Sequence, residues 1–167
     1  RLAAELDPDP QTAEKALELA QMVGDQDEAL LSARRWYELS PGEIEPTRQY
    51  ASLLLEAGKT SAAVKVLREL VKISGASGEP HPELILLSMG LDMDDSALAL
   101  KTMKKVVGKR PDSAAAMLVL SSLALVAGED EEAEKYARGA SVAEPEWNAA
   151  GMQLARVLVG SGRVDQG

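Results

Sequence analysis

The residues Gly58-Lys59-Thr60 have the form of the end of a phosphate-binding loop. Such a loop ends in Gly-Lys-Ser or Gly-Lys-Thr, and its backbone N–H groups surround the phosphates of a nucleotide. It also requires a glycine five residues earlier, where this chain has Leu53, and a strand that leads into the loop. The preceding residues instead place Tyr50, Leu54 and Ala57 at helical spacing. The segment is therefore predicted to be a turn between two helices and not a nucleotide site.

The remaining candidates for chemistry are one histidine and several groups of carboxylates, and the chain has no cysteine. A Ser-His-Asp arrangement would have to use His81, which stands between Pro80 and Pro82, where we expect an exposed loop residue or a helix start. Acidic residues at 94–95 and 129–134 match no calcium-loop spacing and suit the first turns of helices, because the helix dipole favours acids there. We therefore predict no catalytic residue, no cofactor and no metal ligand, and a protein that is not an enzyme.

Composition excludes some partners and favours helices. The chain of 167 residues has 46% hydrophobic residues but only 3% aromatics, and alanine and leucine dominate. Its formal net charge is −9, so phosphate backbones repel it and a nucleic-acid partner is disfavoured. The longest apolar stretch, residues 114–127, is shorter than the roughly 20 residues that a membrane-spanning helix needs.

One basic streak stands out against the acidic composition. It contains Lys101, Lys104, Lys105, Lys109 and Arg110, all within one predicted helix and the residues after it. The streak suits either an acidic partner or a solvated outer helix face whose positive charge lies near the helix C-terminus. No aromatic residues alternate with it, so it does not have the pattern of a single-strand nucleic-acid site.

The chain repeats itself with a period close to 34 residues. Turn glycines occur at positions 24, 58, 128 and 162, and Asp94 stands where the missing member is expected. A small residue follows each of the first four turns, and these residues are Ala29, Ala63, Ala99 and Ala133. We predict repeats at about 10–43, 44–77, 80–113 and 114–147, with partial repeats at 1–9 and 148–167. The extra residues between the second and third repeats are predicted to form a widened loop, 74–83, and not a domain boundary, so that the chain is a single solenoid.

Each repeat is predicted to be a helix, a turn and a second helix. Ala13, Ala16 and Leu17 share one stripe of the first such helix, and Asp25 suits the start of the next. These units resemble tetratricopeptide repeats, through sets such as Ala29/Ala33/Pro41, Ala99/Met103/Pro111 and Ala133/Ala137/Pro145. The tryptophan of the family pattern is absent from every first helix. The resemblance implies an all-α, right-handed solenoid that covers about nine-tenths of the chain.

The resemblance also implies where a partner binds, because first helices line the concave groove of such solenoids. The early first helices carry polar residues there, whereas the later ones are apolar nearly all round. A helix of that kind is buried on every side or awaits a partner. We expect a protein or peptide ligand in the groove, and the candidate residues are Leu84, Ser88, Leu91, Leu118, Ser122, Leu125, Met152, Arg156 and Val159. The carboxylate clamp of chaperone-type repeats is not formed, because Glu14, Glu18 and Leu84 occupy three of its places.

A narrower resemblance concerns the compartment and the partner. Degenerate Ala/Leu-rich repeats with a loop such as "SGASGEPHPELILLSM" are similar to bacterial outer-membrane lipoproteins with tetratricopeptide arrays. Those proteins deliver substrates to a periplasmic C-terminal-processing protease, which implies a periplasmic chain tethered to the outer membrane. Two alternatives remain open. In one, the chain is a regulatory or accessory domain of a larger enzyme; in the other, it is a structural module that self-associates through the cut ends of its repeat array.

Overall fold

The computed structural model describes residues 9–108 and 111–160. These residues form helices and connections and no strand, so the predicted all-α class is confirmed for this part of the chain. The chain divides into two compact units, one ending at Ser77 and the other beginning at Gly78. The terminal parts of the predicted partial repeats, Gly162, Lys109 and Arg110 lie outside the described residues.

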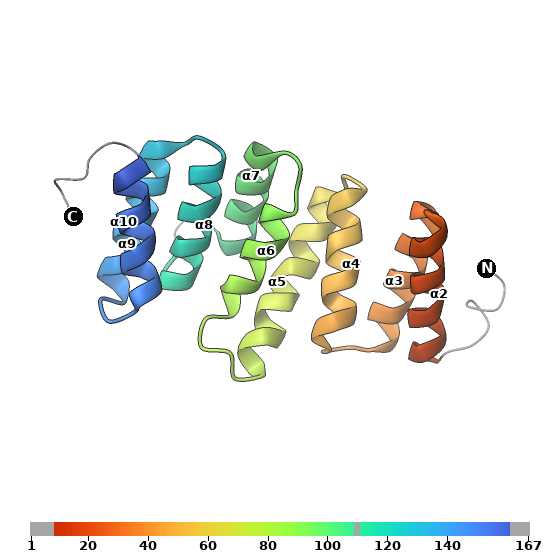
Figure 1. Cartoon of the computed structure of the whole chain (residues 1–167). Helices are drawn as coiled ribbons and strands as arrows, with labels where there is room; N and C mark the ends of the chain where they lie inside the picture. The colour runs from red at the N-terminus through yellow and green to blue at the C-terminus, as the bar shows by residue number, and fades with distance from the viewer. Residues whose placement is uncertain (1–8, 109–110, 161–167) are drawn as a thin grey trace. The chain divides into compact units, whose positions relative to one another are not determined.

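Unit 1 contains two helical hairpins (Figure 1). Its helices are α2 (Pro10–Val23), α3 (Gln26–Leu39), α4 (Ile44–Glu56) and α5 (Thr60–Ala76). Asp9 caps α2 by accepting a hydrogen bond from the Thr12 N–H, and Pro10 occupies a position where a missing N–H is harmless. Gly24 takes the left-handed conformation at the turn (φ 72°), and Asp25 then caps α3. The local sequence therefore specifies both helix ends and the turn between them.

The Gly58-Lys59-Thr60 segment is the corresponding turn of the second hairpin. It follows helix α4, Gly58 has φ 68°, and α5 begins at Thr60. Because a helix and not a strand precedes the glycine, the segment lacks the geometry of a phosphate-binding loop. The prediction of a turn between helices is confirmed.

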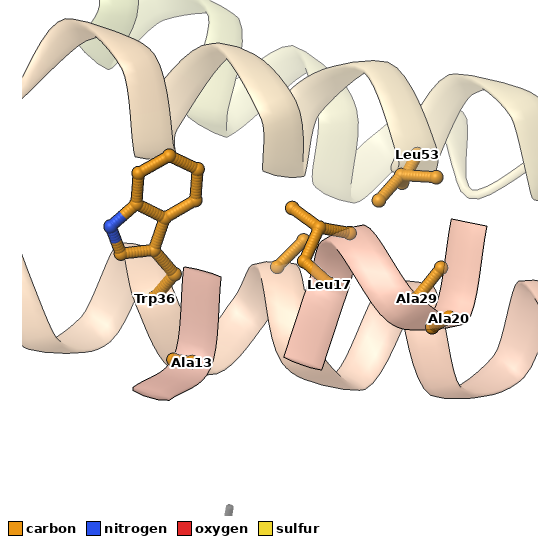
Figure 2. Close-up of a cluster of buried hydrophobic side chains, with 7 residues drawn as sticks. Ala13, Leu17, Ala20, Ala29, Trp36 and Leu53 are labelled. Atoms are coloured by element: carbon orange, nitrogen blue, oxygen red, sulfur yellow. The ribbon is translucent and has the colours of Figure 1, made fainter. Parts of the chain in front are cut away.

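The core of the first hairpin is built from small residues around one tryptophan (Figure 2). Ala29 and Ala33 on α3 are buried, and so is Leu17 on α2. Trp36 of α3 belongs to the same cluster as Leu53 of α4, so its bulk fills the layer between consecutive helices. Small side chains at the hairpin crossing allow the helices to approach closely, and the indole fills the wider space beyond them.

Unit 2 contains two further hairpins and a final helix. Its elements are the 3₁₀ helix η1 (Pro82–Leu84) and helices α6 (Ile85–Leu91), α7 (Ser96–Val107), α8 (Ala114–Val126), α9 (Asp130–Ala143) and α10 (Asn148–Gly160). The predicted widened loop 74–83 is shorter than expected, because α5 continues through Ala76. The division between the units falls within this stretch.

The recurring alanines are buried in each hairpin. Ala63, Ala99 and Ala133 are fully buried, and Ala29 nearly so. Every bend between a first and a second helix falls at the predicted place, at residues 24–25, 57–59, 92–95 and 127–129. Helix–turn–helix hairpins with the predicted bends are therefore present in both units. The helices that open a hairpin or occupy the equivalent position, α2, α4, α6, α8 and α10, are called first helices.

Helix α8 is the interior helix of unit 2. It carries no charged residue, and its side chains from Ala114 to Ala124 are buried with the exception of Met117. It contacts α6, α7, α9 and α10 together with η1. The sequence left open whether a helix that is apolar on all sides is buried or awaits a partner. Most of α8 is buried by the other helices of its own unit.

A buried polar link crosses this interior. The side-chain N–H of Gln153 on α10 donates to Ser121 Oγ on α8 over 3.0 Å. The Ser121 hydroxyl in turn donates to the backbone carbonyl of Ala133 on α9 over 2.9 Å. Since an unpaired polar group costs free energy in such a place, this link fixes the mutual positions of three helices.

Candidate partner-binding face

The nine predicted groove residues lie at matching positions on the three first helices of unit 2. We call them the first-helix face. They form three rows that each run from η1 or α6 through α8 to α10, and successive members of a row are 34 residues apart. The outer rows are apolar and the middle row is polar. The rows are Leu84/Leu118/Met152, Ser88/Ser122/Arg156 and Leu91/Leu125/Val159.

Exposure differs sharply along these rows. Leu118 and Ser122 on α8 retain only 7% and 4% of their accessible surface. On the flanking helices Leu91 is 49% exposed, Met152 72% and Val159 62%, and Ser88 and Arg156 are also exposed. A partner that lies on this face would therefore contact α6 and α10 most directly, and Leu118 and Ser122 stabilise the unit itself.

One end of the face is closed by a hydrophobic cluster. Leu118 is buried there together with Ala114, Ala140 and Ala150. Side chains from η1, from the three first helices and from the residue before α10 pack around these residues and remain partly exposed, and they are Leu84, Leu87, Met117, Trp147 and Ala149. Trp147, at the start of α10, thus has a packing role at this closed end.

His81 covers Trp147 and ties the loop before η1 to the turn between α9 and α10. The imidazole stacks on the indole with ring centroids 4.0 Å apart and an interplanar angle of 8°. Its Nε2 lies 2.9 Å from Oε2 of Glu144. The side chain is 20% exposed and His81 is the N-cap residue of η1, so of the two expectations, an exposed loop residue or a helix start, the helix start is confirmed. The ring pairs with a carboxylate and an indole rather than with a hydroxyl nucleophile.

The other end of the face is open and apolar. Leu91 ends α6, and Leu125, which is partly buried, lies in the last turn of α8. The last turn of α10 lies beside Leu125: a Cβ added to Gly160 would be 3.9 Å from Leu125 Cδ1. The exposed Val159 precedes that glycine. Apolar side chains from three helix ends therefore share this part of the surface.

Charge is almost absent from these helices. Among α6, α8 and α10 the only charged side chain is Arg156. The first helices of unit 1 differ, since α2 carries Glu14 and Glu18, and α4 carries a Glu45–Arg48 ion pair. The first-helix face of unit 2 thus carries a single charge, in a chain whose net charge is −9.

The basic streak lies on another surface of unit 2, where glutamates accompany it. Lys101 and Lys104 on α7 line a cavity of about 500 Å³ together with Glu129, Glu131 and Glu132 at the start of α9. The Lys104 ammonium forms an ion pair with the Glu132 carboxylate. Two of the three described lysines of the streak therefore lie beside acidic side chains.

Two further properties concern metals and membranes. In residues 9–108 and 111–160, no three His, Cys, Asp or Glu side chains gather as a metal ion would require. Within the same residues, every helix falls short of the length and apolarity that a membrane span needs.

The sequence placed the nine face residues in rows but did not indicate their unequal exposure. The periodic pattern treats the three helices alike, whereas the structure puts α8 between its neighbours. The His81–Trp147 contact was also missed, because it joins residues 66 positions apart outside the periodic pattern. The sequence shows a histidine between two prolines and a tryptophan near Pro145. No feature of the sequence indicates that the two side chains are in contact.

Comparison with known proteins gives structural likeness only. No protein-family model and no curated protein sequence matches the chain. The chain is similar to a structure of MamA, residues 41 to the end, from Desulfovibrio magneticus RS-1, with 19% identity, a TM-score of 0.49 and coverage of 93% of this chain and 87% of that one. It is similar to YrrB, described as a tetratricopeptide protein with an unusual peptide-binding site, with 13% identity, a TM-score of 0.47 and coverage of 95% and 81%. It is also similar to TTC0263, a tetratricopeptide protein of Thermus thermophilus, with 20% identity, a TM-score of 0.47 and coverage of 94% of this chain and 85% of that one.

Proposed function

We propose that the protein is a non-catalytic interaction scaffold that binds a segment of a partner protein on the first-helix face of unit 2. The observation that carries this proposal is the combination of exposure and apolar character on α6 and α10. Leu91, Met152 and Val159 are exposed on helices that carry one charge between them. Exposed apolar surface of this kind, with few polar groups, is typical of protein interaction sites.

The closed end of the face supports a defined binding region. The His81–Trp147 stack and the cluster beneath it already bury Leu118, which leaves the open end around Leu91, Leu125 and Val159 for a ligand. A peptide or helix could cover this end without displacing the packed core. Apolar side chains at helical spacing on the ligand would fit such a surface.

The test is a selection of peptides from a displayed library against the purified protein. Selected peptides should bind the wild type and should lose binding to Leu91→Asp and Val159→Asp. The matched control is Val142→Asp on α9, which replaces a similarly exposed valine outside the face. Circular dichroism should show the same helicity for all variants. Peptides that bind the two face variants as tightly as the wild type would place the site elsewhere.

A finer proposal concerns the cell envelope. The resemblance to outer-membrane lipoproteins supports a role as a periplasmic adaptor that presents substrates to a C-terminal-processing protease. Fractionation of cells that produce the full-length protein, followed by co-precipitation, tests both parts. Recovery in the cytoplasmic fraction would contradict the location, and co-precipitation without such a protease would contradict the adaptor role.

Self-association is the rival use of the same surface, because two copies could cover each other's exposed α10 side chains. Light scattering against protein concentration distinguishes the two. On our proposal the mass stays that of one chain at the concentrations used for peptide binding. A mass that doubles with concentration, and returns to one chain in Val159→Asp, would instead assign the face to a second copy.

A further inference from the structure

Arg156 differs from three other exposed arginines of this protein in its surroundings. Arg34, Arg48 and Arg138 each pair with a glutamate three or four positions away on the same helix. The corresponding neighbours of Arg156 include Met152 and Val159, and neither α8 nor α10 contains an acidic residue. Within residues 9–108 and 111–160, the Arg156 guanidinium makes no hydrogen bond or ion pair.

The position of Arg156 places this cation inside the proposed contact surface. Met152 lies one turn before it and Val159 one turn after it on the same side of α10, and all three side chains are exposed. A ligand that covers the two apolar side chains must also remove water from the guanidinium. That desolvation is costly unless the ligand supplies an acceptor, and a carboxylate matches the planar fork of donors best.

The middle row of the face indicates where the acceptor should lie on the ligand. Ser88, Ser122 and Arg156 form a polar row between two apolar ones, and Arg156 stands at its α10 end. A ligand that contacts Met152 of one apolar row and Val159 of the other therefore faces Arg156 between them. Its acidic group should lie between apolar side chains, at the end that meets α10.

Pairing with a second copy fits this chemistry poorly. In a two-fold contact through α10, Arg156 would approach its counterpart, and α10 offers no carboxylate to separate the two cations. Like charges in a desolvated contact are unfavourable. A foreign acidic segment avoids this cost.

Resting on the proposed function, we infer that the ligand is an amphipathic segment with a glutamate or aspartate among its apolar residues, and that its carboxylate pairs with Arg156. Arginine enclosed within an apolar contact commonly contributes strongly to binding. The pairing would set both the register and the direction of the ligand on the face, because only one place on the three helices carries a charge.

The experiment uses the same displayed library, selected in parallel on the wild type and on Arg156→Glu. Peptides selected on the wild type should be enriched in Asp or Glu at one position, and those selected on Arg156→Glu in Lys or Arg at that position. For a selected peptide synthesised with Glu or with Gln there, the Glu form should bind the wild type about tenfold more tightly. The two forms should bind Arg156→Gln equally. Arg138→Gln is the matched control, since it removes an exposed arginine of α9, and it should retain the wild-type preference.

The outcomes separate the two proposals. Peptides that depend on Leu91 and Val159 but show no acidic preference would overturn the inference about Arg156 and leave the proposed function standing. A preference for Glu that persists in Arg156→Gln would overturn it as well. Failure to select any peptide that depends on the face would overturn both.

Discussion

Two glycines on the first helices of unit 2 have opposite surroundings. A Cβ on Gly90 of α6 would lie 2.9 Å from both Cδ atoms of the buried Leu123, whereas a Cβ on Gly151 of α10 would meet nothing within 4 Å. We expect Gly90→Ala to lower the free energy of unfolding by about 1–2 kcal/mol, because overpacking outweighs the gain in helix propensity. Gly151→Ala should raise it by about 0.5–1 kcal/mol. Urea unfolding followed by circular dichroism measures both, and equal effects of the same sign would contradict this packing.

The link between Gln153 and Ser121 makes a second prediction at the residue scale. Ser121→Ala leaves the buried Gln153 amide without its acceptor and should cost about 1–3 kcal/mol of unfolding free energy. Gln153→Leu removes the donor as well, so the double variant should lose less than the sum of the two single losses. The double-mutant cycle is measured by urea unfolding. Strict additivity would mean that the hydrogen bond does not couple α8 to α10.

Sequence reasoning at the residue scale succeeded where the role of a residue depends only on its neighbours in the chain. Gly24, Gly58 and Asp25 were assigned correctly, because left-handed turns and helix caps depend on neighbours in the chain. Gln153 was not recognised as buried. Its polar side chain is acceptable in the interior only because Ser121 lies opposite it, and that depends on the packing of two helices.

At the scale of elements, a tyrosine joins the two second helices of unit 1. The Tyr37 hydroxyl on α3 donates to Glu69 Oε2 on α5 over 2.6 Å. This hydrogen bond, together with partial burial and the neighbouring carboxylate charge, raises the pKa of Tyr37 to about 12. An unfolded tyrosine ionises near pH 10, so the folded protein holds more protons between about pH 10 and 12. The contribution of this contact to stability is fully present below pH 10 and is lost as the pH rises towards 12.

The prediction is measured by absorbance of the phenolate during an alkaline titration. In the wild type, the Tyr37 transition should be the late one, and Glu69→Gln should move it towards pH 10 because the charged acceptor is gone. Tyr37→Phe identifies the transition by removing it. An unchanged titration curve in Glu69→Gln would show that α3 and α5 are not joined by this contact in solution.

The elements themselves were predictable to different degrees. Helical periodicity and turn residues predicted α2 to α5 and α8 to α10 with bends at the right positions. The first helix of the third repeat was less predictable, because it is split into η1 and a seven-residue α6. The extension of α5 through Ala76 was also missed, since the serine and glycine near its end suggested a loop, whereas Ser74 is buried within the helix.

At the scale of the whole molecule, each compact unit contains one tryptophan, Trp36 in unit 1 and Trp147 in unit 2. Ala63 and Ala133 are equivalent, fully buried alanines of the two units. Replacing either with leucine should overpack its hairpin and cost about 1–3 kcal/mol. In repeat proteins such a cost acts first on the affected repeat and its neighbours.

We therefore expect Ala63→Leu to shift the unfolding midpoint reported by Trp36 more than that reported by Trp147, and Ala133→Leu to do the opposite. Single-tryptophan variants, Trp147→Phe and Trp36→Phe, assign the fluorescence signal to each unit. Equal shifts at both tryptophans would mean that the whole chain unfolds as one cooperative body.

The repeat period predicted the hairpin architecture at this scale, because each hairpin repeats the same local rules. It did not predict that the chain divides near Ser77 into two compact units. Nor did it predict which apolar first helix is covered. For α8 that depends on having packed helices on either side, whereas Met152 and Val159 on α10 stay exposed.

The stacking of His81 on Trp147 should also be detectable by proton NMR spectroscopy. With the two rings nearly parallel and 4.0 Å apart, the imidazole protons lie in the shielding region of the indole ring current. Their resonances should therefore appear upfield of those of free histidine. Since the chain has only one histidine, these are its only imidazole signals, and they would report any ligand that separates the loop from the start of α10.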